Sequence, residues 1–417
     1  MNETLKIQNY KGLFMAVHVI QSYPSNNLNR GEDGSPKSCI FGGVRRSRVS
    51  SQCVKRNARM EFYKGVPEND ADGMGIRTKA VPTMILGFLQ GWADDKDSIL
   101  WAETEADKMG AQEAAKAFDL RDISYALSTV GMQVDEKKGK TLKSVYYTTM
   151  KQCAAFAKAM IENGSKRAGE SKDGKVKFSA YSEEEIAKFD DALNSAIALD
   201  ILMFGRMNAG RTIHNVEATV QVAHEISTHR VEEEYDYFTA VDDMKERLNE
   251  AGSAHLDTAE FDSSTMYRYS AMDLGAMFRA MSLNGTETNI ATVAREWVRA
   301  FVLSTPTGKK NSFATDTTPV YVFVSFHEDA PVSYVNAFEK PVTAGVDGYE
   351  TASVKAFEDR VKRSNAIGWR TAPIAELGCS ELPSELTECT WSTFPELLQN
   401  VEKTASDAVE ALKKEFS

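Results

Sequence analysis

The most distinctive chemistry in this sequence is a concentration of positive charge between Lys37 and Arg59. These 23 positions hold seven lysine and arginine residues and no acid, although the whole chain carries a formal net charge of −11. Basic side chains on a surface are commonly just solvated. Seven of them without a counter-charge repel one another, however, so this run predicts a negatively charged partner bound at one confined patch.

The spacing inside the run predicts a helix that could hold a phosphate chain. Ser50 suits the N-cap position, and Val54, Ala58 and Phe62 recur every four residues, which is typical of an amphipathic helix over 51–64. The free amides and the dipole of a helix N-terminus attract anions. We therefore expect the beginning of this helix to face the partner.

The side chains around this helix suit a nucleic-acid backbone better than its bases. Lys37 in the preceding loop, with Lys55 and Arg59 on the helix, could neutralise successive phosphates. Ser50 and Gln52 could bond sugar hydroxyls, which favours RNA. None of these contacts reads a base, so binding should be independent of sequence and sensitive to salt.

Other catalytic and metal-binding patterns fail on spacing. In AHEISTH (223–229) the histidines are five residues apart rather than four, so a helix would not place both at one zinc ion. No phosphate-binding loop and no nucleophile elbow occurs.

The five cysteines are scattered and form no Cys-x-x-Cys pair, which fits a reducing cytoplasm. No apolar stretch approaches the ~18 residues of a membrane span.

Hydrophobic periodicity along the chain predicts an α+β protein. Residues 12–23 alternate as a strand, in which His18 is expected to be a packed side chain. Residues 66–190 favour a mainly helical insertion, and the acidic segment 231–264 favours an excursion from the core. The other expected elements are a buried strand or helix end at 195–207, strands at 216–231 and 318–326, and helices at 288–304 and 394–416.

The basic run also carries a family resemblance. LNRGEDGSPKSCIFGGVRRSRVSSQCVKR (28–56) resembles the N-terminal signature of the CasC family, the repeated backbone subunits of type I-E CRISPR Cascade complexes. The likeness continues in order over six further stretches: FGRM at 204–207, AHEISTH at 223–229, FTAVDD at 238–243, GSAHLDTAEF at 252–261, YRY at 267–269 and NAFEK at 336–340.

The resemblance implies a fold with three parts and a tail. These are a modified RRM-like (ferredoxin-like) palm, a helical fingers insertion, a β-hairpin thumb and a C-terminal helical tail. The implied boundaries are 1–65, 191–230 and 265–380 for the palm, 66–190 for the fingers, 231–264 for the thumb and 381–417 for the tail.

The resemblance also implies a non-catalytic, cytoplasmic crRNA-binding subunit without cofactor or metal. Such subunits polymerise as a helical filament along the guide spacer and present its bases to target DNA in antiviral defence. The implied partners are crRNA, the target DNA strand paired to the guide, further copies of the chain, and the large, small and two crRNA-end-capping Cascade subunits. No membrane partner is expected.

Nine residues are carried over from the family as RNA-binding positions. Met207 resembles the apolar wedge against the bases, and Phe238 and Thr239 resemble the thumb tip that displaces a nucleotide. The acids 232–234 are expected to face a neighbouring copy. The fingers lysines at 172, 175, 177 and 188 are more scattered than the family's cluster and are left out. The residues resembling the crRNA-backbone set are Arg30, Lys37, Ser50, Gln52, Lys55 and Arg59.

Two other functions stay open at the level of sequence. Related backbone subunits of other CRISPR classes cleave target RNA with a loop aspartate, and Glu32 and Asp33 lie in the comparable loop. The alternative is therefore a metal-dependent ribonuclease acting through Asp33. A third possibility is an adaptor that binds only protein, with the basic run meeting an acidic partner.

Overall fold

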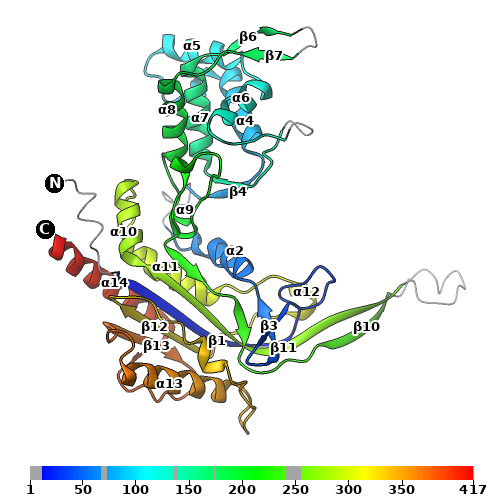
Figure 1. The fold of residues 1–417 in the computed structure, drawn as a ribbon, viewed down its shortest axis with the longest axis vertical. Helices are drawn as coiled ribbons and strands as arrows, with labels where there is room; N and C mark the ends of the chain where they lie inside the picture. Colours follow the sequence, from blue (N-terminus) through cyan, green and yellow to red (C-terminus); the bar gives the residue numbers. More distant parts are fainter. Residues whose placement is uncertain (1–11, 67–72, 136–139, 172–174, 241–254, 417) are drawn as a thin grey trace, which may run out of the picture. The chain divides into compact units, whose positions relative to one another are not determined.

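The structure of the protein is a computed structural model that describes residues 12–66, 73–135, 140–171, 175–240 and 255–416. The chain divides into two compact units, whose elements are drawn in Figure 1. The palm, fingers, thumb and tail, with the boundaries given above, stay predictions. Unit 1 comprises residues 1–66, 220–278 and 288–417, and unit 2 comprises residues 67–219 and 279–287.

Unit 1 is built on a mostly antiparallel sheet. Among the described residues its strand order is β14-β13-β12-β1-β11-β9-β3-β2, and β8 and β10 pair with other parts of β11. The short β13–β14 pair is parallel. The strands are β1 (Phe14–Asn26), β2 (Ser38–Phe41), β3 (Val44–Val49), β8 (Val220–Val222), β9 (Glu225–Ser227), β10 (Glu234–Ala240), β11 (His255–Asp273), β12 (Tyr321–His327), β13 (Ala375–Ser380) and β14 (Thr390–Trp391).

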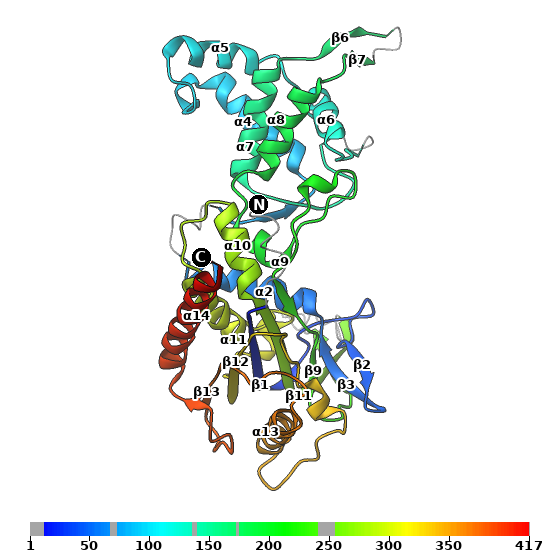
Figure 2. The same cartoon turned by 60° about the vertical axis from the view of Figure 1, so that its left-hand side comes forward.

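Helices cover both faces of this sheet, α13 on one side and α11 with α14 on the other (Figure 1 and Figure 2). On the second side, Trp297 of α11 donates to the Ser270 hydroxyl of β11 at 3.1 Å. The helical elements of unit 1 are α2 (Ser51–Phe62), α11 (Ile290–Leu303), α12 (Lys310–Phe313), η5 (Val335–Phe338), α13 (Glu350–Ile367) and α14 (Phe394–Phe416); α10 (Leu274–Leu283) begins in unit 1 and ends in unit 2.

The central strand β1 explains the apolar run that predicted it. Its residues 15–21 are all buried, because helices pack against both of its faces. The expectation that His18 is a packed side chain is confirmed: its Nδ1 lies 2.8 Å from the Tyr267 hydroxyl, and its ring packs beside Phe323 and Phe357. Burial lowers the pKa of His18 to about 3, so this imidazole is neutral.

A long hairpin leaves the sheet through β10 and β11 (Figure 1). The two strands pair in antiparallel register from Glu234↔Phe261 to Ala240↔His255. The segment 231–264, predicted to be an excursion from the core, thus contains two paired strands, and residues 241–254 lie outside the described part of the chain.

Unit 2 is mainly helical, as predicted for most of its length. Its core packs Ile85, Phe156 and Phe189, each fully buried, between the helices. Its elements are β4 (Ile76–Thr78), α4 (Val81–Asp94), η2 (Lys96–Ser98), α5 (Glu105–Ala115), α6 (Leu120–Thr129), β5 (Tyr146–Thr148), α7 (Met150–Asn163), β6 (Arg167–Glu170), β7 (Val176–Phe178), α8 (Glu183–Asn194), α9 (Leu199–Phe204) and η3 (Thr212–His214).

Two sequence-based expectations differ from the structure in detail. The apolar run at 195–207, read as a buried strand or a helix end, contains the short helix α9, which stops at Gly205 with a φ of 77°. The strand predicted over 216–231 is two strands of three residues, because β8 and β9 pair with separate parts of β11. No helix among the described residues is long and apolar enough to cross a membrane.

Candidate nucleic-acid interface

The helix predicted at the end of the basic run is present as α2. Val54, Ala58 and Phe62 are buried on one side of it, as the four-residue spacing predicted. Ser50 is the N-cap, and its hydroxyl accepts a hydrogen bond from the Cys53 amide at 3.4 Å. The amphipathic helix and its cap are therefore confirmed.

The beginning of α2 is less open to an anion than the sequence predicts. The Ser51 amide donates to His224 Nδ1 at 3.2 Å, and the Cys53 amide is taken by the buried Ser50 hydroxyl. Two of the first amides of the helix thus already have acceptors within unit 1. The basic side chains of α2 are consequently the stronger attraction for a phosphate.

The solvent face of α2 carries Gln52, Arg56 and Met60, which are spaced every four residues and are all exposed. Lys55 and Arg59 lie beside this stripe and are half-buried. Sequence reasoning selected Gln52, Lys55 and Arg59 but missed Arg56. The helical spacing of Arg56 from Gln52 was the signal that could have found it.

The three arginines of β3, Arg45, Arg46 and Arg48, differ in burial and in hydrogen-bond partners. Arg46 is buried, and its guanidinium donates to the carbonyls of Phe41, Ser227 and Phe338 at 3.2, 3.1 and 2.7 Å. Burial lowers the pKa of Arg46. In contrast, Arg45 is exposed and forms an ion pair with Glu233.

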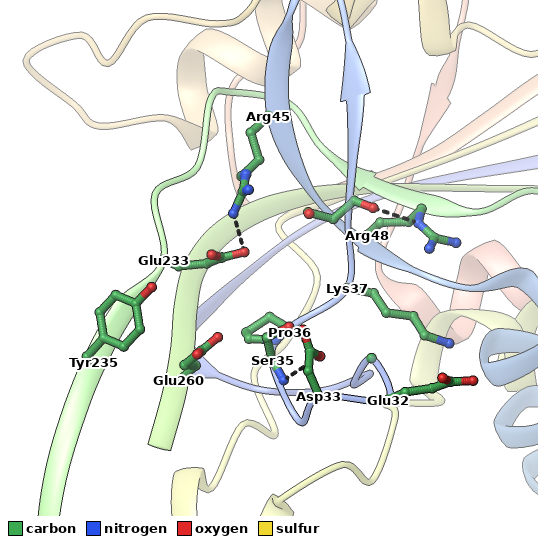
Figure 3. A pocket seen from close by; sticks show the side chains of 12 residues that line it. Glu32, Asp33, Ser35, Pro36, Lys37, Arg45, Arg48, Glu233, Tyr235 and Glu260 are labelled. Atoms are coloured by element: carbon green, nitrogen blue, oxygen red, sulfur yellow. Dashed lines mark hydrogen bonds and ion pairs between the residues drawn. The ribbon is translucent and has the colours of Figure 1, made fainter. Parts of the chain in front are cut away.

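Arg48, the third of these arginines, lines a surface hollow of about 620 Å³ in unit 1 (Figure 3). Its Nε donates to the Ser38 carbonyl at 3.2 Å. Lys37 and Glu32 lie on one side of the hollow, and Tyr235 and Glu260 lie on the other (Figure 3). The hollow therefore offers cations to a phosphate chain but also carboxylates, so its charge is mixed.

The loop beneath this hollow contains Arg30 and Asp33. Arg30 is exposed and forms an isolated antiparallel bridge with Pro36, which closes the loop. Asp33 accepts hydrogen bonds from the Ser35 hydroxyl at 2.7 Å and the Ser35 amide at 3.2 Å, and these bonds lower the pKa of the Asp33 carboxyl. Among the described residues, no group of three potential metal ligands is found.

The two apolar contacts expected against the bases lie in different units. Met207 in unit 2 is 79% exposed, so it is a surface side chain rather than core filler. Phe238 in β10 of unit 1 is 44% exposed and pairs in register with Asp257. Thr239 pairs with Leu256 in the same hairpin, and its side chain lies outside the described residues, as do residues 241–243 of FTAVDD.

Comparison with known families decides what kind of chain this is. The model of the CT1975-like protein family matches residues 15–403. The chain belongs to the CT1975-like protein family. No curated protein sequence matches it.

Solved structures similar to this CT1975-like chain come from RNA-guided complexes. A chain of a "CRISPR RNA-guided surveillance complex, pre-nicking" has a TM-score of 0.75 and 25% identity, and the match covers 94% of this chain and 100% of that chain. A chain of a "CRISPR RNA-guided surveillance complex" has a TM-score of 0.56 and 21% identity, over 94% and 99% of the two chains.

These matches agree with a Cas-type protein that has a mixed α+β fold and a central, mostly antiparallel sheet. The finer predictions, membership of type I-E and an RRM-like palm, stay predictions.

Two acids at the base of the β10–β11 hairpin of the CT1975-like chain form ion pairs within the chain. Glu232 pairs with Arg230 at 2.9 Å, and Glu233 pairs with Arg45. Both partners belong to the same chain, and Glu232 keeps 77% of its side chain exposed. The expectation that these acids face a neighbouring copy stays a prediction. Sequence reasoning missed the second of these pairs because Arg45 is far from Glu233 along the chain.

The lysines set aside in unit 2 are partly engaged. Lys175 and Lys177 are exposed beside and within β7. Lys188 lies 3.8 Å from Glu162 in an ion pair. Lys172 lies outside the described residues.

Proposed function

We propose that this protein is a non-catalytic crRNA-binding backbone subunit of a CRISPR surveillance complex of type I-E. It grips the phosphate backbone of the guide and presents the bases for pairing with target DNA in antiviral defence. Specificity then belongs to base pairing, while the protein reads backbone and shape. The likeness to chains of RNA-guided surveillance complexes supports this role.

The observation that carries the proposal is the cationic surface of unit 1 on an acidic chain. Arg56 projects from α2, and Lys37 and Arg48 line the hollow. Within the described residues none of these three forms an ion pair with an acid, in contrast to Arg45. Cations without an internal counter-charge are available to neutralise phosphates.

The proposed partners follow from this role. Copies of the chain assemble head to tail as a helical filament along the crRNA. The other Cascade subunits, large, small and the two that cap the crRNA ends, join this filament in the cytoplasm. The target DNA strand pairs with the guide that the filament holds.

The first experiment asks whether the purified protein carries RNA. We expect a discrete RNA of uniform length, which an adaptor that binds only protein would lack. Lys37→Ala combined with Arg56→Ala should reduce the RNA retained, about equally for unrelated guides. Lys355→Ala combined with Lys362→Ala on α13 is the matched control, because it also removes two positive charges, both of which are paired with Glu385.

A ribonuclease remains the second candidate because Asp33 is an exposed carboxylate with a lowered pKa beside the hollow. It predicts metal-dependent cleavage of target RNA that Asp33→Ala abolishes. Our proposal predicts that wild-type and Asp33→Ala complexes leave target RNA equally intact. Cleavage lost in Asp33→Ala would refute the non-catalytic role.

A further inference from the structure

One surface loop of unit 2 presents two large apolar side chains to solvent. This loop, residues 206–216, is called here the Met207 loop. Met207 is 79% exposed and Ile213 is 60% exposed, whereas Arg206, Asn208 and His214 beside them are buried. Thr212 and Asn215 of the loop are exposed as well, but at positions 206–208 and 213–214 the polar side chains are buried and the large apolar ones are exposed, which reverses the usual arrangement.

The backbone of the Met207 loop is held at its base and at its tip. Arg206 and Val216 exchange two backbone hydrogen bonds of 2.9 and 2.8 Å. Within the loop, the Asn208 amide donates to Asn215 Oδ1 at 2.6 Å. At the tip, Gly210 lies against Gly131 so closely that a Cβ on Gly210 would be 2.2 Å from the Gly131 carbonyl oxygen.

A buried arginine fastens the loop to the helices beneath it. The Arg206 guanidinium donates to the His214 carbonyl at 2.8 Å within the loop. It also donates to the Leu193 carbonyl of α8 at 3.1 Å and to Gln152 Oε1 of α7 at 3.2 Å. One side chain thus joins the two ends of the loop to two helices.

A second buried group, His214, fixes the side of the loop that carries Ile213. His214 Nε2 donates to Asp190 Oδ1 at 2.9 Å, and its Nδ1 accepts from Asn208 Nδ2 at 3.1 Å. Burial lowers the pKa of this imidazole, so the neutral ring that satisfies both bonds is the stable form. Asp190 is in turn held by Arg211 in a two-bond ion pair.

We propose that Ile213 is a second base-contacting residue, which belongs to the same stiff loop as Met207 and packs against the faces of nucleobases in the bound RNA. The inference rests on the proposed function. The face of a base suits these two side chains because Met207 and Ile213 offer no charge, and the one cation between them, Arg211, is paired with Asp190.

Rigidity is the reason to single out Ile213 from other exposed apolar residues. Leu100 of unit 2 is 88% exposed, and such single residues are common on protein surfaces. Ile213 differs because its neighbour His214 is locked between Asp190 and Asn208. A preorganised apolar contact loses little freedom on binding, so it can add affinity that a mobile side chain cannot.

The test compares RNA dissociation from complexes of the full chain carrying Ile213→Ala, Ile213→Val or Leu100→Ala. We expect Ile213→Ala to release RNA about fivefold faster, a fraction of the effect of burying a whole isoleucine side chain. Ile213→Val, which keeps a branched apolar group, should stay near wild type, as should Leu100→Ala. Thermal melting should be unchanged, since the Ile213 side chain is exposed.

Three results separate the possible failures. Wild-type protein that carries no RNA would overturn the proposed function itself. RNA retained equally by wild type, Ile213→Ala and Leu100→Ala would overturn only the role of Ile213. Loss of self-association in Ile213→Ala with unchanged RNA release per protomer would also overturn it, and would mark Ile213 as a contact between proteins.

Discussion

The basic run of unit 1 and the Met207 loop of unit 2 use arginine in opposite ways. In the basic run, Arg48 and Arg56 reach the surface, and Arg46 is withdrawn into the core. In the Met207 loop, Arg206 is buried and the neighbouring Met207 side chain is exposed to solvent. The number of charges in a sequence therefore does not show which of them can contact a partner. Some arginines are buried and donate hydrogen bonds to backbone carbonyls of their own chain.

The largest expected effect contrasts a buried arginine with an exposed one. Arg46→Ala leaves the carbonyls of Phe41, Ser227 and Phe338 without their donor and should lower the free energy of unfolding by about 4 kcal/mol. Arg56→Ala should change it by less than about 0.5 kcal/mol. Urea unfolding of both variants checks this. Equal free energies of unfolding for Arg46→Ala and Arg56→Ala would contradict a structural role for Arg46 that Arg56 lacks.

The next effect concerns a buried acid of unit 1. Glu225 is 1% exposed and lies 3.7 Å from Arg268 Nε, and burial raises its pKa from 4.5 to about 7. Because the pKa of Glu225 is higher in the folded protein than in the unfolded chain, its protonated carboxyl stabilises the fold below pH 4.5. This contribution is lost as the pH rises from 4.5 to 7.

Glu225→Gln should therefore be more stable than wild type above pH 7, by up to about 3 kcal/mol, and similar to it near pH 4.5. Arg268 keeps its carbonyl acceptors at Phe301, Val302 and Ser304 in the variant. Melting temperatures between pH 4.5 and 8.5 measure the effect. A variant with the same pH profile as wild type would show that folding does not raise the pKa of Glu225.

A smaller effect is expected in RNA binding at the flank of α2. Replacing Lys55 and Arg59 by Ala should weaken binding about tenfold and reduce the slope of log affinity against log salt by up to about 1.4, for two phosphate contacts on a single strand. Titrations at several salt concentrations with unrelated guides provide the measurement. A loss that depends strongly on guide sequence would contradict backbone binding.

The smallest effect on affinity is expected at Phe238, which is half-exposed in the β10–β11 hairpin. Phe238→Ala should leave RNA loading within about twofold of wild type, since Phe238 is proposed to displace a nucleotide, and the phosphate contacts that hold the backbone remain. It should instead alter the regular spacing of nuclease footprints on the guide. Tyr237→Ala, on the neighbouring position, is the control, and identical footprints in all three proteins would exclude displacement by Phe238.

Local pattern predicted much of this fold. The strand at β1, the helix α2 with Ser50 as its cap, and helices α11 and α14 follow from spacing within a few residues. The split between β8 and β9 could not be predicted in the same way. It depends on pairing with β11, whose residues lie about forty to fifty positions further along the chain.

The candidate site was predictable to a lesser extent. The exposure of Met207 and the burial of Arg46 both depend on partners distant in sequence, such as Leu193 for the loop and Phe338 for the arginine. The pairing of Glu233 with Arg45 is of the same kind. Residue type and spacing identified the cationic region, and tertiary contacts decided which of its members face outward.

The turn between β2 and β3 has a consequence for how related sequences should differ. A Cβ on Gly42 would lie 1.7 Å from the Glu339 carbonyl oxygen, and Arg46 donates to the carbonyl of Phe338. The FGG stretch thus packs directly against the backbone of the NAFEK stretch, although about three hundred positions separate them in the sequence. Among homologues we expect changes in one stretch to be accompanied by changes in the other, and chimeras that exchange only one of them should accumulate poorly in cells.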